Sequence, residues 1–551
     1  MDHDVPVLIA GGGLVGLSLA VFLAQHGITA HLVERRDHTS AVPRGRSLNV
    51  RSMEVFRAAG LEPALRGAPP SVLRDFPEIA RAATLTGPET FHAVRPAPES
   101  YARISPTTPL MVDQNAVEPV LREHADRAGC ALRFGTELLS FRQDPAGVTA
   151  HLRDLRSGRD RTVRARYLIA ADGHRSQIRE RLGITTGPAH DSVRYVSIPF
   201  AADLGPALRG RRLALCYLQR PAPRTVLTRL DSPERWVLMV PADIVGDDPS
   251  QEHCRALVRQ AVGWDDAPVR LLRQKDTALD RWELSSWVAD RYRDRRVLLA
   301  GDAVHVTPPA GGLGGNTGIQ DAHNLAWKLA LVLRGLAGDA LLDTYEEERR
   351  PVAVAACAFS LASQRDRTGG THRPAPADGA PAPAPGDPLA VILGHRYRSA
   401  AVAGDHEPGT PTPPAPTPPA PAPVAEWNGD PGSRAPHLPL VRHGARISSL
   451  DLYGKHFVLL AGPRADRWAR AARSAGLPVP LHVHQLGHDI TDPQGAWPRA
   501  HGVTDAGAVL VRPDGFVCWR ARRPAPDDPE HRLAEVLRRT LALPAADPAA
   551  R

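Results

Sequence analysis

The feature that most constrains the fold is a glycine-rich turn near the start of the chain. Residues 5–10 (VPVLIA) form a short, wholly apolar run, and GGGLVG at 11–16 follows it directly. Apolar residues then recur at helical spacing as far as Leu23. A second apolar run, 30–33, ends at Glu34. This order predicts a strand, a tight turn, a helix and a second strand, which together make one βαβ unit.

Three glycines of this turn, Gly11, Gly13 and Gly16, have the G-x-G-x-x-G spacing of dinucleotide-binding sites. The first permits the tight turn, the second lets backbone approach a pyrophosphate, and the third lets the helix pack closely on the strand. The start of the helix offers N–H groups and a positive dipole end to that anion. Glu34 lies where a carboxylate accepts hydrogen bonds from a ribose, and its charge would repel a 2′-phosphate. The unit therefore predicts a site for FAD or NAD and disfavours NADP there.

A second glycine-rich segment, residues 295–330, decides between these two cofactors. An apolar strand at 296–300 ends in Gly301-Asp302, where a short carboxylate can hydrogen-bond a ribityl chain. The glycines of 311–315 lead into a helix expected to begin near Asn316-Thr317. The N-terminus of that helix can face an electron-rich ring. Two helix N-termini from distant parts of the chain fit an elongated dinucleotide, which favours FAD.

Length and proline content predict several domains and a linker. At 551 residues the chain exceeds the ~250–300 residues at which a single hydrophobic core stops growing. Its 54 prolines are about twice the usual share. Many of them lie in the Pro/Ala-rich stretches 373–388 and 407–424, a composition that favours an extended spacer. Between about 180 and 290 the pattern alternates as strands do, which predicts an inserted sheet domain.

Charge and cysteine usage exclude several function classes. The 68 basic and 60 acidic residues give a net charge of +8, but the basic residues are dispersed, so we expect no nucleic-acid partner. The five cysteines lie far apart, in no metal-ligand spacing and no CxxC pair, so we expect neither a metal site nor disulfides. The first residues lack a basic n-region, and no apolar run reaches ~18 residues. We therefore expect a soluble, cytoplasmic protein that has no membrane partner.

A third signal, Asp172-Gly173 after an expected strand at 166–171, lies between the two glycine-rich segments. In this order the three signals resemble the class A flavoprotein aromatic hydroxylases (monooxygenases) across residues 1–360. Within that family the chain is most similar to the bacterial polyketide-tailoring hydroxylases of the anthracycline, angucycline and tetracenomycin type. Five further segments carry this resemblance along the chain: 43–60, 113–125, 393–402, 434–440 and 508–520.

The resemblance implies an α/β fold of the para-hydroxybenzoate-hydroxylase type. It combines a Rossmann-like FAD-binding domain, an inserted β-sheet substrate domain and a thioredoxin-like C-terminal domain. The expected divisions are 1–180 and 285–395 for the FAD-binding domain, 181–284 for the substrate domain, 396–427 for the linker and 428–551 for the C-terminal domain. That last domain has a single cysteine, Cys518, so dithiol chemistry is not expected of it. A packing or dimerisation role is expected instead, in a monomer or a homodimer.

The resemblance also implies roles for particular residues. The glycine turn would surround the FAD pyrophosphate, Glu34 would bind the adenosine ribose, and Asp302 would hold the ribityl chain. The complete set of expected FAD-binding residues is Gly11, Gly13, Leu14, Val15, Gly16, Glu34, Arg35, Arg44, Gln114, Asp302, Gly314, Gly315 and Asn316. One departure is Leu313-Gly314-Gly315, which stands where many relatives have Gln-Gly-Met.

The implied activity is hydroxylation of a polycyclic aromatic polyketide in antibiotic biosynthesis, with tightly bound FAD, transient NADPH and O2. Baeyer–Villiger oxidation, or epoxidation with rearrangement, on a similar polyketide stays open, as does a non-catalytic flavin-binding partner. No catalytic residue is assigned. The candidate bases or cations are His305, Tyr217, Arg103 and Arg229, and each is expected to be packed or solvated instead. The substrate cavity is expected between the inserted sheet and the flavin ring, with mainly aliphatic walls.

Overall fold

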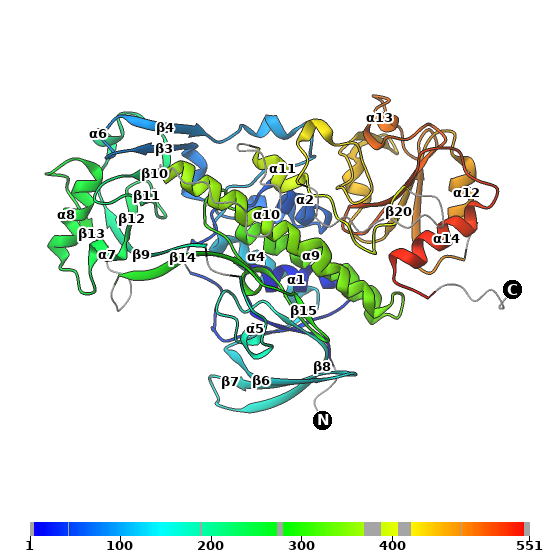
Figure 1. Ribbon diagram of the computed structural model, residues 1–551, viewed down its shortest axis with the longest axis horizontal. Helices are drawn as coiled ribbons and strands as arrows, with labels where there is room; N and C mark the ends of the chain where they lie inside the picture. The colour runs from blue at the N-terminus through cyan, green and yellow to red at the C-terminus, as the bar shows by residue number, and fades with distance from the viewer. Residues whose placement is uncertain are drawn as a thin grey trace.

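The computed structural model describes residues 5–41, 43–187, 190–272, 279–368, 387–405, 420–474 and 476–544. Two long helices, α9 (Gly314–Leu333) and α10 (Asp343–Thr368), cross the middle of the molecule (Figure 1). A β-rich region lies at one end of the long axis and the C-terminal domain at the other (Figure 1). Within the described ranges, no helix combines the length and the apolar character needed to cross a bilayer.

The first sheet has eight strands in the order β15-β16-β8-β1-β2-β5, with β7 paired to β8 and β6 to β7. Strands β16, β8, β1, β2 and β5 run parallel. The bounds are Val5–Ala10 (β1), His31–Glu34 (β2), Ala131–Phe134 (β5), Thr136–Asp144 (β6), Gly147–Asp154 (β7), Asp160–Ala170 (β8), Arg293–Asp294 (β15) and Val297–Leu299 (β16).

Burial on both faces explains the unbroken apolar sequence of β1. Val7, Leu8 and Ile9 are all fully buried, as parallel strands covered on both faces usually are. Helix α1 (Leu14–Gln25) follows; it is buried from Gly16 to Leu23 and packs on α9. A helix that is apolar on every side belongs inside a protein core. The predicted βαβ unit is therefore present, with its helix in the interior.

Six further helices belong to this part of the chain. They are α2 (Val50–Ala58), α3 (Glu62–Gly67), α4 (Gln114–Arg127), α5 (Gln177–Arg181), α11 (Pro388–Leu393) and α10. Helix α9 begins at Gly314, two residues before the predicted start, because Leu313 and not Gly315 is its N-cap residue. Helix α10 begins at Asp343 and continues through Pro351.

The second sheet has nine strands in the order β17-β14-β9-β12-β11-β10-β3-β4, with β13 paired to β9. Helix α8 (Gln251–Val262) covers one face, and its apolar side completes a separate core. The other bounds are Glu78–Ala82 (β3), Glu89–Val94 (β4), His190–Ala201 (β9), Leu213–Leu218 (β10), Thr225–Arg229 (β11), Arg235–Pro241 (β12), Arg270–Leu271 (β13), Asp280–Val288 (β14), His305–Val306 (β17), Gly205–Leu208 (α6) and Ala242–Val245 (α7).

This sheet differs from the predicted division of the chain at one point. Strands β3 and β4 come from within 1–180, the range expected to belong to the FAD-binding domain. They join the second sheet because β3 pairs in parallel with β10, for example Ala80 with Cys216. The sheet is therefore built from two separate parts of the chain.

The C-terminal domain contains a four-stranded sheet in the order β21-β20-β22-β23. Strand β21 runs parallel to β20, and the remaining pairs are antiparallel. The bounds are Pro439–Arg442 (β18), Ala445–Ser448 (β19), Phe457–Ala461 (β20), Leu481–Gln485 (β21), Ala508–Val511 (β22), Val517–Ala521 (β23), Asp466–Ser474 (α12), Trp497–His501 (α13) and Pro529–Thr540 (α14). Cys518 is buried, and burial raises the pKa of its thiol to about 12.

The C-terminal sheet shares one core with the FAD-binding domain. Phe457 of β20 meets the ring of Trp327 of α9 edge to face, with the ring centroids 5.8 Å apart. Within the predicted linker 396–427, Tyr397 is only 4% exposed. Residues 406–419, like 373–386 of the first Pro/Ala-rich stretch, lie outside the described residues. The described start of the linker is therefore part of the packed structure.

Candidate cofactor site

The predicted cofactor segments meet at one edge of the parallel sheet. Backbone hydrogen bonds from Gly11 to Val33 (2.8 Å) and from Ala171 to Ala10 (2.8 Å) join neighbouring strand ends. A third, from Ala300 to Ala170 (2.9 Å), adds the next strand. Because parallel strands end at the same edge, the GGGLVG turn, Glu34, Asp172-Gly173 and Gly301-Asp302 lie around a common space. Such an edge is the usual ligand site of open α/β sheets.

The glycine turn is too tight for side chains. Gly11 has φ +114°, and a Cβ there would lie 2.1 Å from the carbonyl oxygen of Ala171. A Cβ on Gly16 would lie 1.9 Å from the carbonyl oxygen of Gly11. Gly13 is the N-cap residue of α1, with no side-chain cap and no acidic residue in the first turn. The first N–H groups of α1 are therefore left for an anion.

The side chains next to this turn serve packing. A Cβ on Gly301 would lie 2.7 Å from Cγ2 of Val15, and one on Gly318 only 2.5 Å from the same atom. Leu14 similarly approaches Gly315, where a Cβ would lie 3.2 Å from its Cδ2. The side chains of Leu14 and Val15 thus pack α1 against α9, so the role expected of these residues at the pyrophosphate would fall to their backbone N–H groups.

Glu34 is oriented by two backbone groups. Its Oε2 accepts a hydrogen bond from the N–H of Gly12 (2.7 Å), and its Oε1 accepts one from the N–H of Arg36 (3.0 Å). A carboxylate oxygen has a second lone pair, which remains for a ribose hydroxyl. Arg35 is exposed and lines an open groove of about 480 Å³ that begins directly after Glu34. Glu34 and Arg35 are therefore placed as an adenosine-binding end would require.

Gln114 and Arg44 belong to a second layer around the turn. Gln114 accepts from the N–H of Gly45 (3.3 Å) and donates to Glu118 (2.7 Å), which in turn accepts from the N–H of Ser40 (2.8 Å). These bonds hold Ser40 and Gly45 in place, and Gly45 is next to the exposed Arg44. The sequence prediction missed Glu118, a buried residue one helical turn after Gln114 on α4. Gln114 and Glu118 are four residues apart on one helix, and this spacing is the sequence signal that could have predicted their contact.

Asp302 lies in the short helical turn Gly301–Ala303, which follows β16. Its side chain reaches solvent, yet the surrounding protein desolvates the carboxylate and raises its pKa, against the opposing effect of His305, His174 and Arg44. Arg179 joins this segment to the Asp172 segment by donating to the carbonyl oxygens of Ala303 (3.2 Å) and His174 (3.1 Å). A carboxylate held in such a recess fits a ligand that brings hydroxyl donors to it.

The start of α9 presents backbone groups to the same space. Its N-cap residue, Leu313, provides no side-chain cap, and the first turn has no acidic residue. The N–H groups of Gly314, Gly315 and Asn316 are therefore available to a ligand. A Cβ on Gly314 would lie 2.8 Å from Oγ1 of Thr307, so a side chain there would require Thr307 to move.

The predicted role of Asn316 is confined to its backbone, because its side chain is bonded to other protein groups. Its Oδ1 accepts from the N–H of Asn49 (2.8 Å), and its Nδ2 donates to the carbonyl oxygens of Ser47 (3.1 Å) and Gly312 (2.8 Å). The side chain is buried and fully used in joining the start of α9 to the segment before α2. Only the backbone N–H of Asn316 is left for the predicted role.

Three of the four candidate bases or cations are buried side chains. His305 is fully buried, and its Nε2 shares a 2.6 Å hydrogen bond with Asp321 of α9. Arg229 is buried against the rings of Phe76 and Trp236, and burial lowers its pKa to about 10. Of the remaining two candidates, Tyr217 is buried. Arg103 is exposed.

The face of the second sheet turned away from α8 looks toward α10. Side chains alternate along each strand, so Tyr195, Tyr217, Val226 and Met239 lie on this face, opposite the core that contains Cys216, Leu227 and Leu238. The ring of Tyr195 stacks on that of Trp282, with the ring centroids 4.9 Å apart. The expectation of aliphatic walls does not hold for this face.

Two family models match the chain. The one described as FAD binding domain matches residues 4–360, and the one described as aromatic-ring hydroxylase, C-terminal matches 428–544. Fold and site define an FAD-binding oxidoreductase with uncapped helix N-termini around its cofactor space. The chain belongs to the FAD-dependent aromatic-ring monooxygenases.

Among the residues the structure describes, no cluster of His, Cys, Asp or Glu side chains is suited to a metal ion.

Individual relatives match over nearly the whole chain. Tetracenomycin A2 monooxygenase-dioxygenase of Streptomyces glaucescens is 41% identical over 99% of this chain and 98% of its own. A 4-methyl-5-nitrocatechol 5-monooxygenase of a Burkholderia species is 41% identical over 98% of both chains. The solved structure of aklavinone-11 hydroxylase with FAD and aklavinone is 36% identical, has a TM-score of 0.86 and covers 98% of this chain and 100% of its own.

Proposed function

We propose that this enzyme hydroxylates a polycyclic aromatic polyketide in antibiotic biosynthesis. The observation that carries the proposal is the full-length likeness to aklavinone-11 hydroxylase, whose structure holds FAD and the polycyclic aklavinone. The arrangement of the site supports it, because two uncapped helix N-termini, Glu34 and Asp302 converge at the same edge of the parallel sheet.

In this proposal each part of the site has one task. The N-terminus of α1 binds the pyrophosphate, Glu34 binds the adenosine ribose, and Asp302 binds the ribityl chain. The N–H groups of Gly314 to Asn316 stabilise negative charge on the flavin ring. When bound and reduced, FAD activates O2 and supplies the oxygen atom that enters the aromatic ring.

The substrate is proposed to lie between the second sheet and the flavin ring. Residues 181–284 together with β3 and β4 would form its outer wall, in which Tyr195 and Tyr217 are packed side chains with 2% and 3% exposure. Trp282 supports Tyr195 from behind by stacking and donates a hydrogen bond to Ser197 (3.0 Å). Such a wall positions a ring system and excludes water from the reacting carbon.

NADPH is proposed as the electron donor that visits transiently. The sequence has no second G-x-G-x-x-G turn after a strand, so the donor lacks a dinucleotide-binding turn of its own. The carboxylate of Glu34 disfavours a 2′-phosphate at the turn that does exist. A donor that binds briefly, reduces the flavin and leaves accounts for both features.

The relative named 4-methyl-5-nitrocatechol 5-monooxygenase favours a second candidate, a single-ring nitrophenol substrate. The two candidates differ in size, so affinity separates them. A substrate that spans the sheet face buries several rings, whereas one ring covers only part of it, and each buried apolar Å² contributes about 25 cal/mol.

The test uses the purified full-length holoenzyme. NADPH oxidation is measured with polycyclic quinones and with 4-methyl-5-nitrocatechol, under labelled O2, and products are identified by mass and NMR. We expect a polycyclic substrate to accelerate NADPH oxidation and to gain labelled hydroxyl oxygen on an intact ring. A ring-expanded lactone would instead indicate Baeyer–Villiger oxidation, and a rearranged epoxide the other alternative. Preference for the nitrocatechol, or no stimulation by any compound, would contradict the proposal.

Light scattering of the purified protein distinguishes a monomer from a homodimer.

A further inference from the structure

Asp321 on α9 holds both ends of the turn that carries Asp302. Its Oδ2 accepts a hydrogen bond from the N–H of Gly301 (3.2 Å) and lies 2.6 Å from Nε2 of His305. Gly301 and His305 enclose the short helical turn around Asp302. Asp321 is itself fully buried. Burial opposes its ionisation, but His305 and Arg349 outweigh that effect and hold its pKa below the usual range.

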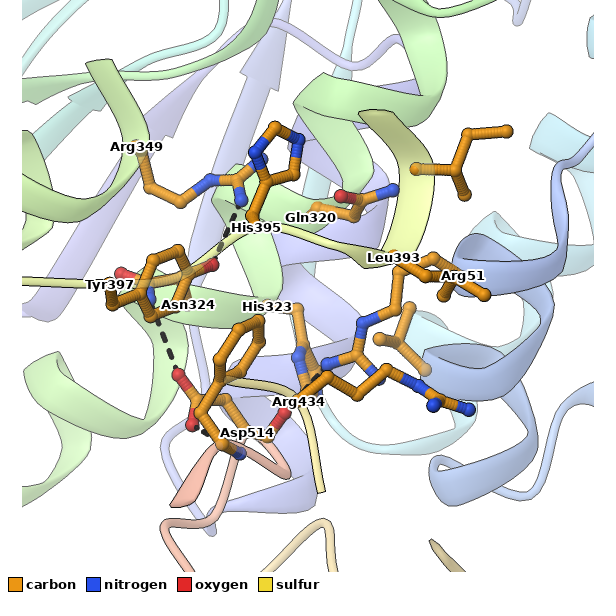
Figure 2. A pocket seen from close by; sticks show the side chains of 13 residues that line it. Arg51, Gln320, His323, Asn324, Arg349, Leu393, His395, Tyr397, Arg434 and Asp514 are labelled. Carbon is orange, nitrogen blue, oxygen red and sulfur yellow. Dashed lines mark hydrogen bonds between the residues drawn. The ribbon is translucent and has the colours of Figure 1, made fainter. Parts of the chain in front are cut away.

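Arg349 of α10 connects this carboxylate to two other places. Its Nε donates to Oδ1 of Asp321 (2.8 Å), and one terminal nitrogen donates to the carbonyl oxygen of Thr317 (3.2 Å) in the first turn of α9. The other terminal nitrogen donates to the hydroxyl oxygen of Tyr397 (2.9 Å), a bond that Figure 2 shows as a dashed line. Arg349 is 1% exposed, so all three bonds form away from bulk water.

Tyr397 continues the connection into the C-terminal domain. Its ring stacks on Phe516, with the centroids 4.0 Å apart, and its backbone N–H donates to the carbonyl oxygen of Gly432 (2.7 Å). An unbroken series of buried contacts therefore runs from the C-terminal domain through Tyr397, Arg349 and Asp321 to the Asp302 turn. It spans residues that are far apart in the sequence.

The cavity beside this series is too small for an organic ligand. Arg349, Tyr397, His323, Asn324 and Asp514 line it in Figure 2, and it has room for about one water molecule. Its guanidinium groups are already hydrogen-bonded to protein groups. The cluster is therefore suited to holding neighbouring elements in place and not to binding a second substrate.

We propose that Arg349 is a positioning residue through which the C-terminal domain fixes the Asp302 turn and the first turn of α9 against the flavin. The inference rests on the proposed placement of FAD at these two turns. A planar guanidinium with three directed bonds suits this task, whereas a lysine ammonium cannot make the same three bonds. The C-terminal domain thus contributes to the flavin site without touching it.

A neighbouring set of contacts provides a matched control. Glu348, next to Arg349, accepts hydrogen bonds from Lys328 (2.8 Å) and from Ser399 (2.6 Å). Arg512 of the C-terminal domain also binds Glu348 through both terminal nitrogens, at 2.5 and 2.8 Å. This set joins the same helix to the same domain but has no hydrogen bond to Asp321 or to the Asp302 turn. Tyr397→Phe and Ser399→Ala each remove one hydroxyl from the same segment, and only the first reaches Arg349.

The experiment compares full-length wild-type holoenzyme with Tyr397→Phe, Ser399→Ala and Arg349→Lys. Dissociation of FAD is followed by its fluorescence, the bound flavin by visible circular dichroism, and unfolding by heat. We expect Tyr397→Phe to raise the Kd of FAD about tenfold, and Arg349→Lys about 10- to 100-fold, with altered visible circular dichroism. We expect Ser399→Ala to keep the wild-type Kd and spectrum. In steady-state assays of Tyr397→Phe and Arg349→Lys, kcat should fall while KM for the aromatic substrate stays unchanged.

The controls separate this inference from the proposed function. If Tyr397→Phe and Ser399→Ala give the same FAD Kd and the same spectrum, the positioning role is wrong, whatever their effects on unfolding. If Arg349→Lys retains the wild-type FAD Kd and the wild-type spectrum, the positioning role is also wrong. Failure of the wild-type protein to bind FAD at all would instead overturn the proposed function.

Discussion

Arg434 of the C-terminal domain and Glu54 of α2 form a buried, two-pronged ion pair across the domain interface. The Nε of Arg434 donates to Oε2 of Glu54 (2.8 Å), and a terminal nitrogen donates to Oε1. Both side chains are 3% exposed. Arg51 adds a third donor to Glu54 at 3.0 Å. Burial opposes ionisation of Glu54, but Arg434 outweighs it and holds the pKa of Glu54 below its usual range.

Removing one partner of this pair should loosen the domain interface. Arg434→Met leaves the buried charge of Glu54 with Arg51 as its remaining guanidinium partner, so the free energy of unfolding should fall by about 3 kcal/mol. Thermal and denaturant unfolding of the holoenzyme measure the loss. Arg464→Met is the control, because Arg464 pairs with Asp505 at 3.1 Å on the surface, where ion pairs contribute little. Equal losses in the two variants would show that the buried pair has no special weight.

The stability of the enzyme should decline in mild acid because of His26. This histidine ends α1 and is buried, and burial together with Arg334 and His456 lowers its pKa to about 4. The unfolded chain takes up the proton near pH 6.5, so stability is complete above that pH and is lost as the pH falls toward 4. The full loss from this one group is about 3 kcal/mol.

The variant His26→Gln checks this pH dependence. Unfolding free energies measured between pH 7.5 and pH 4 should fall less steeply than those of the wild-type protein, because the titrating group is gone. His253→Gln is the control, since His253 lies exposed on α8. A slope unchanged in His26→Gln would exclude His26 as the source of the acid sensitivity.

The glycine turn should tolerate no side chain at Gly16. A Cβ there would lie 1.9 Å from the carbonyl oxygen of Gly11, so α1 would have to move away from β1 and its N–H groups would leave the pyrophosphate. We expect Gly16→Ala to weaken FAD binding about 100-fold, measured by the ratio of flavin absorbance to protein absorbance after gel filtration. Gly67→Ala is the matched control, because no atom lies within 4 Å of that position. Full flavin content in Gly16→Ala would contradict the assigned role of the turn.

The parts of the fold that were predictable from sequence depend on neighbouring residues. Strand β1, the glycine turn, α1 and Glu34 lie within one βαβ unit, so local pattern and spacing are enough to place them. Asp302 was placed correctly at the end of a strand for the same reason. These segments converge at one sheet edge because parallel strands end there together, a rule that does not require knowledge of side-chain contacts.

The remaining features depend on partners far away in the sequence. Strand β3 belongs to the second sheet only because it pairs with β10, more than a hundred residues later. The side chain of Asn316 is withdrawn from the cofactor because Ser47 and Asn49 bind it. Tyr397 lies in a stretch read as linker, and its burial is visible only when Phe516 is placed beside it. No local pattern contains these partners.

The charge of Glu34 should set both the affinity and the kind of dinucleotide bound. Its two oxygens accept N–H groups at 2.7 and 3.0 Å, and an amide would direct an N–H donor at one of those donors. We therefore expect Glu34→Gln to weaken FAD binding by about 10- to 100-fold, measured by fluorescence titration. Asp126→Asn changes the charge by the same amount at the far end of α4, and because Asp126 is exposed its FAD affinity should stay within about twofold of wild type. If both variants lose affinity equally, general electrostatics and not ribose recognition governs this end of the site.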